Sequence, residues 1–450
     1  MNEQRTTVGK ALRINLDPQI YGTFAEIGAG QEVARFFFQA GKASQTIAKT
    51  ISAYDMIYSD EIYGKEKNGR YVCESRLLHM LDKEYSLLER RLKNHRGNQS
   101  LFFALANTVT TAGKGQSHGW MGVRFQKKPM GPSNDIIVHF RLLDRSRLQQ
   151  QEALGILGVN LMNVAFFFLN QQTQIIPELV DGLKPGQVAI DVLKFSGPDT
   201  KNLNQGVFAL ELVKRDLCDA VLFSPQMEII HLPDYVFQKN LVVLRGSFDP
   251  LTKIHTHLLD RGIAFAETCI SEKKTKSKKS STELAVLLEL TTSSWNKKSS
   301  ESESAGRNEA QQTEYNQNEM KALLKKVQNL TKLGHGILVS NFFLFYKLKR
   351  HLRMYNDEKI AMLLGAAHLE KLFDEKYYSD LEGGILEGLS KLLNDDTQLY
   401  IYPHKTKELC LTSDSFFPKE PMNQIYQYFK KSQKILDIAN CDDIEIERKV

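Results

Sequence analysis

The stretch VVLRGSFDPLTKIHTHLL, residues 242–259, joins an apolar segment to a helical one through a turn that contains glycine and proline. Its first part is β-branched and apolar, as a strand buried inside a parallel sheet would be. Asp249 and Pro250 stand where the cap and the first turn of a helix are expected. The stretch therefore predicts a strand, a loop and a helix N-terminus, which is the repeating unit of an α/β fold.

The same alternation continues on both sides of this stretch. Strand-like segments lie at 135–143, 188–197, 219–225, 240–246, 283–292, 336–340 and 398–403, and helical patterns fill most intervals, including 145–170 and 202–216. Short apolar strands that alternate with helices predict a mostly parallel, Rossmann-like sheet covered on both faces. Ligands of such sheets usually bind beyond the carboxyl ends of the strands, where the loop after Arg245 is expected.

Three regions are predicted along the 450 residues: a mostly helical N-terminal region at 1–130, a Rossmann-like α/β region at 131–410, and a helical tail at 411–450. In the first region, leucines recur at helical spacing from Ser75 to His95, and Gly97 predicts the end of that helix. Two polar segments, at about 271–283 and 293–319, are expected to be flexible loops. The first carries five lysines in thirteen residues, and the second has few apolar residues.

The net charge of +6 is a mild basic excess, compatible with anionic ligands but not indicative of nucleic-acid binding. No two of the five cysteines form a C-x-x-C pair, so reduced thiols are expected rather than a zinc site or a disulfide framework. The N-terminus lacks the apolar segment of a signal peptide, and the most apolar windows, 161–169 and 336–346, are too short to span a bilayer. A soluble, cytoplasmic protein without a membrane span is expected, and its oligomeric state stays open.

Residues 242–259 resemble the N-terminal motif of the HxGH nucleotidyltransferases, which include nicotinate-nucleotide and pantetheine-phosphate adenylyltransferases. In that motif a strand runs into G-[ST]-F-D-P, and [HT]-x-G-H then opens a helix. The matching residues here are Gly246, Ser247, Phe248, Asp249, Pro250, Thr252 and His255. The resemblance implies ATP with Mg²⁺ as cofactor.

The resemblance also implies a role for each part of the loop. Thr252 and His255 would be the catalytic pair that contacts triphosphate oxygens. The backbone of Gly246, Ser247 and Phe248 would approach the nucleotide, and Arg245 and Lys253 would be auxiliary cations. This chemistry is coherent, because nucleotidyl transfer relies on backbone donors, a helix N-terminus and cationic groups around the phosphates.

Two features depart from the nucleotidyltransferase motif. Ile254 stands where the family has glycine, and a side chain there would crowd the nucleotide. The nearest counterpart of the distal I-S-S-T-x-[IL]-R motif, KSSTEL at 279–284, lacks the arginine. Two functions therefore remain open. One is a nucleotide-binding protein that transfers AMP from ATP, as nicotinate- or nicotinamide-mononucleotide adenylyltransferases do, and the other is a non-catalytic cytosolic binding or scaffold protein.

Three further segments each allow a functional and a structural interpretation. FAEIGAGQEVAR, at 24–35, is similar to the first glycine motif of S-adenosylmethionine methyltransferases, but YGTF is a poor strand, and a turn before a helix explains the same residues. His118 and Trp120 could line a ligand loop or be packed and hydrogen-bonded. The carboxylates of 373–389 could hold Mg²⁺ or mark a solvated helix junction broken at Gly383 and Gly384.

Longer stretches of the chain resemble one bacterial family of uncharacterised proteins. The stretches are YGTFAEIGAGQEVARFFF, TIAKTISAYDM, HGWMGVRFQ, QQEALGILGVNL, VVLRGSF and EKYYSDLEGGILE. Its members often carry the labels "TonB-dependent receptor" or "nicotinate-nucleotide adenylyltransferase". The receptor label implies a signal peptide and many alternating strands of about ten residues, and this sequence predicts neither. The family carries no established catalytic residue, so the resemblance adds no functional residue.

Overall fold

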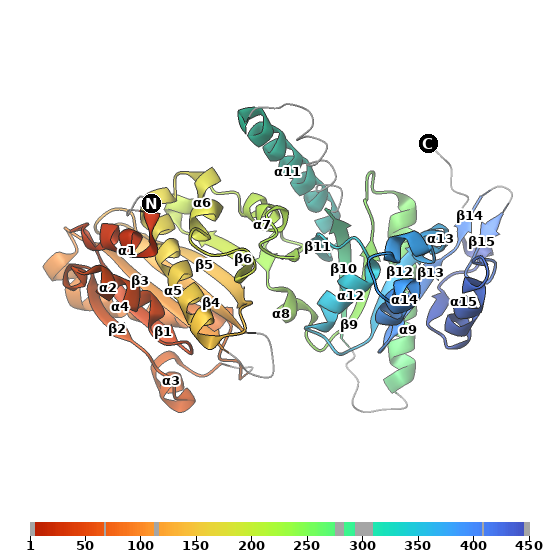
Figure 1. The fold of residues 1–450 in the computed structure, drawn as a ribbon, viewed down its shortest axis with the longest axis horizontal. Coiled ribbons are helices and arrows are strands. Elements are labelled where there is room, and N and C mark those ends of the chain that lie inside the picture. The colour runs from red at the N-terminus through yellow and green to blue at the C-terminus, as the bar shows by residue number, and fades with distance from the viewer. Residues whose placement is uncertain are drawn as a thin grey trace. The chain divides into compact units, whose positions relative to one another are not determined.

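A computed structural model of the chain describes residues 5–66, 69–111, 117–274, 283–292, 309–406 and 409–444 (Figure 1). The chain divides into two compact units, Met1–Cys218 (unit 1) and Asp219–Val450 (unit 2). Each unit contains a sheet with helices packed on it, so the α/β class is confirmed. The boundary lies at 218, not near 130, because the strands from 133 to 196 pair with the N-terminal strands in one sheet.

The sheet of unit 1 has six strands in the order β2-β1-β3-β4-β5-β6. Their bounds are β1 Ile20–Ile27, β2 Ile47–Ile51, β3 Leu101–Thr110, β4 His118–Gln126, β5 Ser133–Leu142 and β6 Val188–Ser196. Strand β1 is parallel to both of its neighbours, whereas β3, β4, β5 and β6 follow one another antiparallel. The sheet of unit 1 is therefore mixed.

The prediction of a mostly helical N-terminal region is wrong, because residues 1–130 contain the four strands β1, β2, β3 and β4. Strands β1 and β3 are buried on both faces, so they lack the alternation of polar and apolar residues that marks a half-exposed strand. Strand β1 contains Gly22 within YGTF, the segment that was expected to be a poor strand. A Cβ at Gly22 would lie 2.1 Å from the carbonyl oxygen of Phe103, so glycine permits the close approach of β3.

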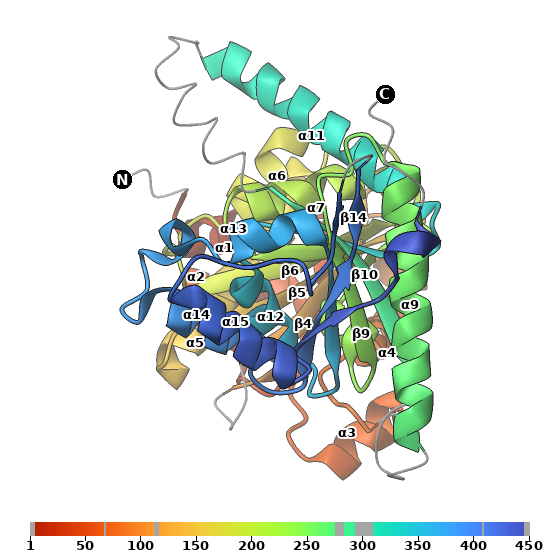
Figure 2. The ribbon, with the colours of Figure 1, turned by 90° about the vertical axis from the view of Figure 1, so that its right-hand side faces the viewer.

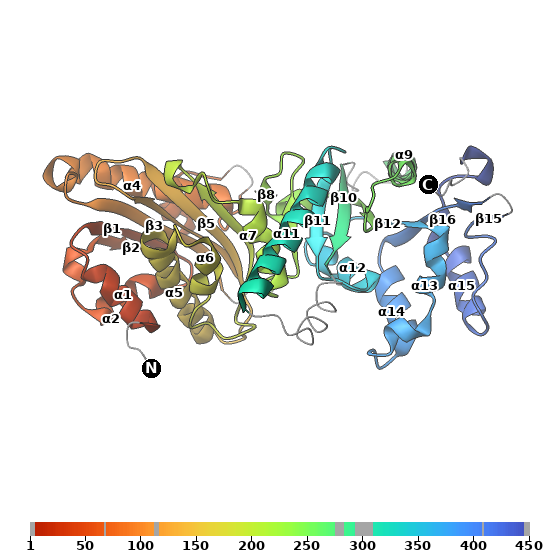
Figure 3. The ribbon, with the colours of Figure 1, turned by 90° about the horizontal axis from the view of Figure 1, so that it is seen from above.

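Helices cover both faces of the unit 1 sheet, with α4 on one face and α1, α2, α5 and α6 on the other (Figure 3). The bounds are α1 Thr7–Asn15, α2 Glu32–Ala40, α3 Met56–Tyr63, α4 Glu74–Arg96, α5 Arg147–Asn163, α6 Gln172–Leu179 and α7 Gln205–Lys214. The helices predicted near 75–95, 145–170 and 202–216 are confirmed. Within the described residues, only the helix at Arg147–Phe168 is long and apolar enough to cross a membrane, and 72% of its apolar window is buried, as in a core helix.

The sheet of unit 2 has eight strands in the order β16-β13-β12-β9-β10-β11-β7-β8. Their bounds are β7 Ala220–Phe223, β8 Ile229–Ile230, β9 Asn240–Arg245, β10 Leu284–Thr291, β11 Gly336–Ser340, β12 Ile360–Gly365, β13 Thr397–Tyr402 and β16 Ile435–Asp437. From β16 to β11 every pair is parallel, and β7 and β8 add an antiparallel edge. The mostly parallel, Rossmann-like sheet is therefore confirmed in unit 2.

The path of the chain through these six parallel strands is doubly wound. It starts at β9, adds β10 and β11 on one side, and then returns to add β12, β13 and β16 on the other side. This is the strand order 3-2-1-4-5-6 of dinucleotide-binding sheets. The winding direction reverses between β9 and β12, and a crevice is expected beyond their carboxyl ends.

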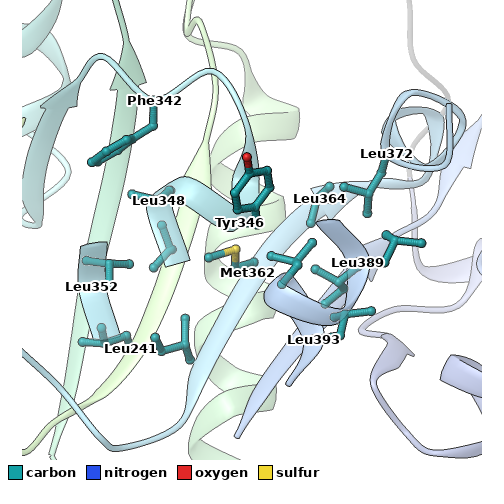
Figure 4. Packing of buried hydrophobic residues seen from close by; sticks show 14 of the residues in the cluster. Leu241, Phe342, Tyr346, Leu348, Leu352, Met362, Leu364, Leu372, Leu389 and Leu393 are labelled. Carbon is teal, nitrogen blue, oxygen red and sulfur yellow. The ribbon is translucent and has the colours of Figure 1, made fainter. Parts of the chain in front are cut away.

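The unit 2 sheet has α9 on one face and α12 and α14 on the other (Figures 2 and 3). The bounds are α8 Leu232–Val236, α9 Lys253–Lys274, α11 Glu309–Thr331, α12 Phe345–Arg353, α13 Leu369–Leu372, α14 Gly384–Leu393 and α15 Met422–Lys431. Leu241 of β9 and Met362 of β12 pack with Leu352 and Leu389 of the covering helices (Figure 4). Side chains alternate between the two faces of a sheet, so Leu363, which follows Met362 in β12, faces α9 and lies against Gly262.

The predicted polar loops and tail need correction. Residues 275–282 and 293–308 lie outside the described residues, but helix α11 begins at Glu309, inside the segment expected to be a loop. The tail contains α15 as predicted and also β16, and a hairpin of β14, His404–Lys405, with β15, Cys410–Leu411, comes just before it. Cys410 and Cys441 form a disulfide, so reduced thiols were the wrong prediction for these two. A pairing of distant cysteines leaves no spacing motif in the sequence.

Candidate functional site

Arg245, predicted to be a cation for phosphate, is turned into the sheet. Its Nε and Nη2 donate to the two carboxylate oxygens of Glu289 on β10, at 2.6 and 3.0 Å. Its Nη1 donates to the carbonyl of Phe343, and its guanidinium lies over the ring of Phe345. Glu289 is fully buried and also accepts from the hydroxyl of Ser340. Arg245 therefore neutralises a buried carboxylate and is not displayed to a ligand.

The same ion pair occupies the position where dinucleotide-binding sheets bind ribose. In those proteins an acidic residue at the end of the second strand accepts from the ribose hydroxyls. Strand β10 is the second strand here, and Glu289 is near its carboxyl end. Both oxygens of Glu289 already accept from Arg245 and Ser340. The geometry therefore does not favour a dinucleotide bound in the usual way.

The space beside Gly246, the glycine of the motif, is also filled by a side chain of the protein itself. The ring of Phe248 is buried, and a Cβ built at Gly246 would lie 3.0 Å from it. Ser247 is exposed, and Asp249 forms an ion pair with Lys326 of α11. The space that a nucleotide would need beside Gly246 is thus filled by a side chain of the same loop.

Thr252 and His255 come together, as the motif implies, but they bond to each other. The Nδ1 of His255 accepts from the backbone N–H of Thr252 at 3.1 Å and lies 2.8 Å from its hydroxyl. The backbone N–H of His255 in turn donates to the carbonyl of Thr252. Thr252 thus directly precedes α9 with His255 three residues on, and the bond from the Thr252 N–H to the His255 side chain is one of the two hydrogen bonds of a capping box. Lys253 is exposed on the first turn, and Ile254 is half-buried.

A second set of polar side chains lies on α9 and at the carboxyl ends of β12 and β13. His257, in the second turn of α9, lies 2.6 Å from the hydroxyl of Tyr402 through its Nδ1. Tyr402 ends β13 and pairs in register with Gly365, the last residue of β12. His368 follows three residues after Gly365 and bonds to its backbone, and His404 follows Tyr402 by two residues. We call this set, with Lys371, the switch-point cluster.

The protein around the switch-point cluster lowers the pKa of one of its imidazoles, His368. Desolvation by the surrounding protein lowers the pKa of His368, the ammonium of Lys371 and the ring of His404 lower it further, and the hydrogen bond with Gly365 opposes them. His368 is therefore neutral at pH 7. An anion bound between these groups would favour protonated imidazoles, so binding would be accompanied by proton uptake.

The sequence contained a signal for the switch-point cluster that the motif match did not use. His404 follows the strand predicted at 398–403, and His257 was part of the opening stretch. His368 follows β12, IAMLLG, a strand that was not predicted. Imidazoles directly after two strands indicate a site, because the carboxyl ends of neighbouring parallel strands meet at one edge of the sheet.

In unit 1, the helix N-terminus that follows the loop after β1 is also bonded by a side chain of the same protein. Glu26 is fully buried, and its carboxylate accepts from the backbone N–H groups of Val33 and Ala34 at the start of α2 and from the amide of Asn107. A strand does precede the glycines, contrary to expectation, but a carboxylate of the chain holds the helix N-terminus that a methyltransferase ligand would need. The structural interpretation, a turn before a helix, is confirmed.

The position of Glu26 makes the stability of unit 1 depend on pH. Burial raises the pKa of Glu26 from 4.5 to about 7, against the lowering effect of its three hydrogen bonds. The folded state therefore holds a proton that the unfolded state releases, and stability falls as pH rises from 4.5 to about 7. We expect a loss of about 3 kcal/mol in the unfolding free energy of unit 1 across this window.

Glu26→Gln should remove this slope, because the amide does not titrate. Urea unfolding measured from about pH 5 to about pH 8 checks the expectation. Glu152→Gln, at an exposed carboxylate of α5, is the matched control and should keep the wild-type slope. A wild-type protein equally stable across the range, or a slope that survives in Glu26→Gln, would contradict the assignment.

The remaining sequence candidates take structural positions. His118 and Trp120 lie in strand β4, paired with β3 and β5, so they do not form a loop. Asp374 accepts from the backbone N–H of Lys376 and forms an ion pair with its ammonium. A short 3₁₀ turn, Glu375–Tyr378, and the start of α14 at Gly384 follow, which is the helix junction of the structural interpretation.

These observations define an α/β protein of two units, whose second unit has a Rossmann-type sheet with imidazoles at its switch point. A scan against models of protein families gives no match, and neither does a search of curated proteins. Solved structures of competence-related proteins show similarity over part of the chain. The competence/damage inducible protein CihA from Agrobacterium tumefaciens is 18% identical, with 35% of this chain and 94% of that chain covered and a TM-score of 0.27.

Two other solved structures give similar values. A competence-damaged protein (CinA) superfamily protein from Enterobacter cloacae is 10% identical, with coverage of 36% of this chain and 90% of that chain and a TM-score of 0.26. A competence or damage-inducible protein from Enterobacter asburiae is 11% identical, with coverage of 37% and 99% and a TM-score of 0.27. These similarities assign no function to the chain.

Proposed function

We propose that unit 2 binds a nucleotide or another small phosphorylated molecule at the carboxyl edge of its sheet. The observation that carries the proposal is the switch-point cluster, three imidazoles and Lys371 beside the point where the strand order reverses. Open α/β sheets bind ligands at this position, and imidazole and ammonium groups are suitable donors to phosphate oxygens. The N-terminus of α9 adds partial positive charge at the same edge.

The finer form of the proposal is AMP transfer from ATP with Mg²⁺, in a cytoplasmic protein. For this activity Thr252 and His255 must exchange their mutual hydrogen bond for contacts with phosphate oxygens. Lys253, exposed on the same turn, is the remaining cation of the motif, since Arg245 is held by Glu289. His257, one helical turn after Lys253 and hydrogen-bonded to Tyr402, offers a further imidazole on the same helix.

A non-catalytic binding or scaffold protein is the second candidate. It is favoured by the ring of Phe248 over Gly246 and by the buried ion pair of Arg245, since both close the loop from within. This candidate predicts that no nucleotide changes the stability of unit 2.

A thermal-shift experiment separates the two candidates. Millimolar ATP with Mg²⁺ should raise the melting temperature of the full chain, because a ligand at 100 times its Kd stabilises the native state by about 2.7 kcal/mol. The double variant His257→Ala/His368→Ala should lose the shift. His335→Ala, at the amino end of β11 on the opposite edge of the sheet, should keep it. No shift with any mononucleotide or triphosphate would favour the scaffold.

A pyrophosphate-release assay tests the finer proposal. ATP, Mg²⁺ and a panel of mononucleotides that includes nicotinate and nicotinamide mononucleotide should release pyrophosphate. His255→Ala should reduce the rate by about 10²-fold or more if the imidazole contacts the transferred group. Nucleotide binding without pyrophosphate release would retain the binding function and reject the transferase.

A further inference from the structure

The disulfide of unit 2 joins two segments at the edge of the sheet where the switch-point cluster lies. Cys410 is in β15, and Cys441 begins a 3₁₀ turn that follows β16. The two cysteines are 31 positions apart in the sequence, with α15 and β16 between them. Strand β16 runs parallel to β13, and just beyond it the N–H of Ile438 donates to the carbonyl of Ile401. Cys441 therefore lies beyond the carboxyl end of β16, at the same edge as the end of β13.

The hairpin of β14 and β15 connects this disulfide to the switch-point cluster. His404, a member of the cluster, is the first residue of β14, and the charge of its ring contributes to the lowered pKa of His368. In the hairpin, His404 pairs with Leu411 and Lys405 pairs with Cys410. The residue next to His404 along β14 is thus paired with a cysteine of the disulfide.

The hairpin is too short to be stable by itself. Each of its strands contains two residues, and even longer isolated hairpins are marginally stable in water. Both strands are linked to the turn after β16, β15 through the disulfide and β14 through the ammonium of Lys405, which donates to the carbonyl of Cys441 at 2.7 Å. A covalent cross-link limits the conformations open to the segments it joins. The disulfide therefore favours the position that His404 has in this structure.

The segment that follows the hairpin is held by bonds of its own. The N–H and the hydroxyl of Ser413 donate to the carboxylate of Asp437 in β16, at 2.9 and 2.8 Å. The carbonyl of Ser413 accepts from the hydroxyl of Tyr426 in α15 at 2.6 Å. Ser413 is fully buried, and none of these bonds involves sulfur. Loss of the disulfide should therefore leave α15 and β16 in place and loosen the hairpin.

The disulfide is partly accessible to a reductant. Cys410 and Cys441 are both half-buried, whereas the free cysteines Cys73 and Cys218 are buried. Thiol–disulfide exchange begins when a thiolate reaches one of the two sulfurs, so its rate depends on access. Accessible disulfides are the labile and regulatory ones, in contrast to those enclosed in a core.

We propose that Cys410 and Cys441 are a reversible redox site that controls the affinity of the switch-point cluster for its phosphorylated ligand. In the reduction, a thiolate of a dithiol reductant attacks one sulfur and the S–S bond breaks. The second thiol of the reductant then displaces the remaining cysteine from the mixed disulfide. Two electrons and two protons pass to the protein, both cysteines become thiols, and the reductant becomes a disulfide. The inference rests on the function proposed for unit 2.

Calorimetric titration of the full chain with ATP and Mg²⁺, with and without dithiothreitol, tests the proposal. The oxidised protein should bind about tenfold more tightly, because it holds His404 in position and coupling between two sites is typically of this size. Cys410→Ser/Cys441→Ser should bind as the reduced protein does and should not respond to dithiothreitol. Cys269→Ser, at a half-buried free thiol of α9, is the matched control and should keep the response.

Hydrogen exchange measured by mass spectrometry reports on the hairpin without any ligand. Peptides that contain β14 and β15 should exchange about tenfold faster after reduction, and those of α15 should be unchanged. Unchanged exchange in the hairpin would overturn the proposal, and so would free thiols at Cys410 and Cys441 in protein alkylated without a reductant. If the double serine variant does not fold, the wild-type protein with and without dithiothreitol decides the question.

The titration also separates this inference from the proposed function. Equal affinity for ATP in the oxidised and reduced proteins would overturn the redox control and leave the proposed function intact. Absence of ATP binding in both forms would reject the proposed function, and the redox control of binding with it.

Discussion

Arg245→Met should destabilise unit 2 by about 3–5 kcal/mol, because it leaves the carboxylate of Glu289 buried without its cation. The side chain of Glu289 has no exposed surface, and Arg245 supplies both of its charge-assisted hydrogen bonds. The single hydroxyl of Ser340 cannot replace them. Differential scanning calorimetry of the full chain should show one transition moved to lower temperature, and the transition of unit 1 should stay where it is.

Two further variants locate the cause of this effect. Arg215→Met removes a partly exposed cation that pairs with Glu211 one helical turn away, and it should cost at most about 0.5 kcal/mol. The double variant Arg245→Met/Glu289→Met should recover most of the loss, since apolar replacement of a buried ion pair is often neutral or stabilising. If Arg245→Met melts like Arg215→Met, the pair does not contribute as inferred.

The strands of unit 2 could be predicted because short apolar segments between helical ones mark a parallel sheet. Five of the segments identified in the sequence are strands of unit 2, at 219–225, 240–246, 283–292, 336–340 and 398–403. Their order across the sheet could not be predicted. Pairing between β9 and β12 joins residues more than 100 positions apart, and no local pattern records it. The switch point, and with it the candidate site, depends on this pairing.

The two glycine loops show why a motif match can mislead about a site. A helix begins with backbone N–H groups that need acceptors, and a ligand or a side chain of the same chain can supply them. At α2 the acceptor is the carboxylate of Glu26, and at α9 it is Nδ1 of His255. The local sequence is similar whether the acceptor is a ligand or a side chain, because the turn requires the same glycines and capping residues in both cases. The position of Arg245 was missed for a related reason, since its partner Glu289 is on another strand.

Gly28→Ala should prevent stable folding of unit 1, with an expected loss of more than about 4 kcal/mol in its unfolding free energy. Gly28 follows β1 with a φ of +100°, and a Cβ there would lie 1.8 Å from the carbonyl oxygen of Val109 on β3. That oxygen belongs to the backbone of a central strand, so it cannot move away without breaking the pairing of the sheet. Circular dichroism during urea unfolding measures the loss, and proteolysis should convert unit 1 to fragments.

Gly64→Ala is the matched control, because it separates the contact with Val109 from the backbone conformation. Gly64 ends α3 with a φ of +84°, and a Cβ built there has no atom within 4 Å. Alanine at Gly64 should therefore lose only the conformational preference of glycine, about 1–3 kcal/mol, because a φ of 84° with a ψ of 159° is adopted readily by glycine alone. If both variants lose the same small amount, the carbonyl of Val109 does not require glycine at position 28. If Gly28→Ala alone fails to fold, the loop that resembles a cofactor motif contains its glycine for the packing of β1 beside β3.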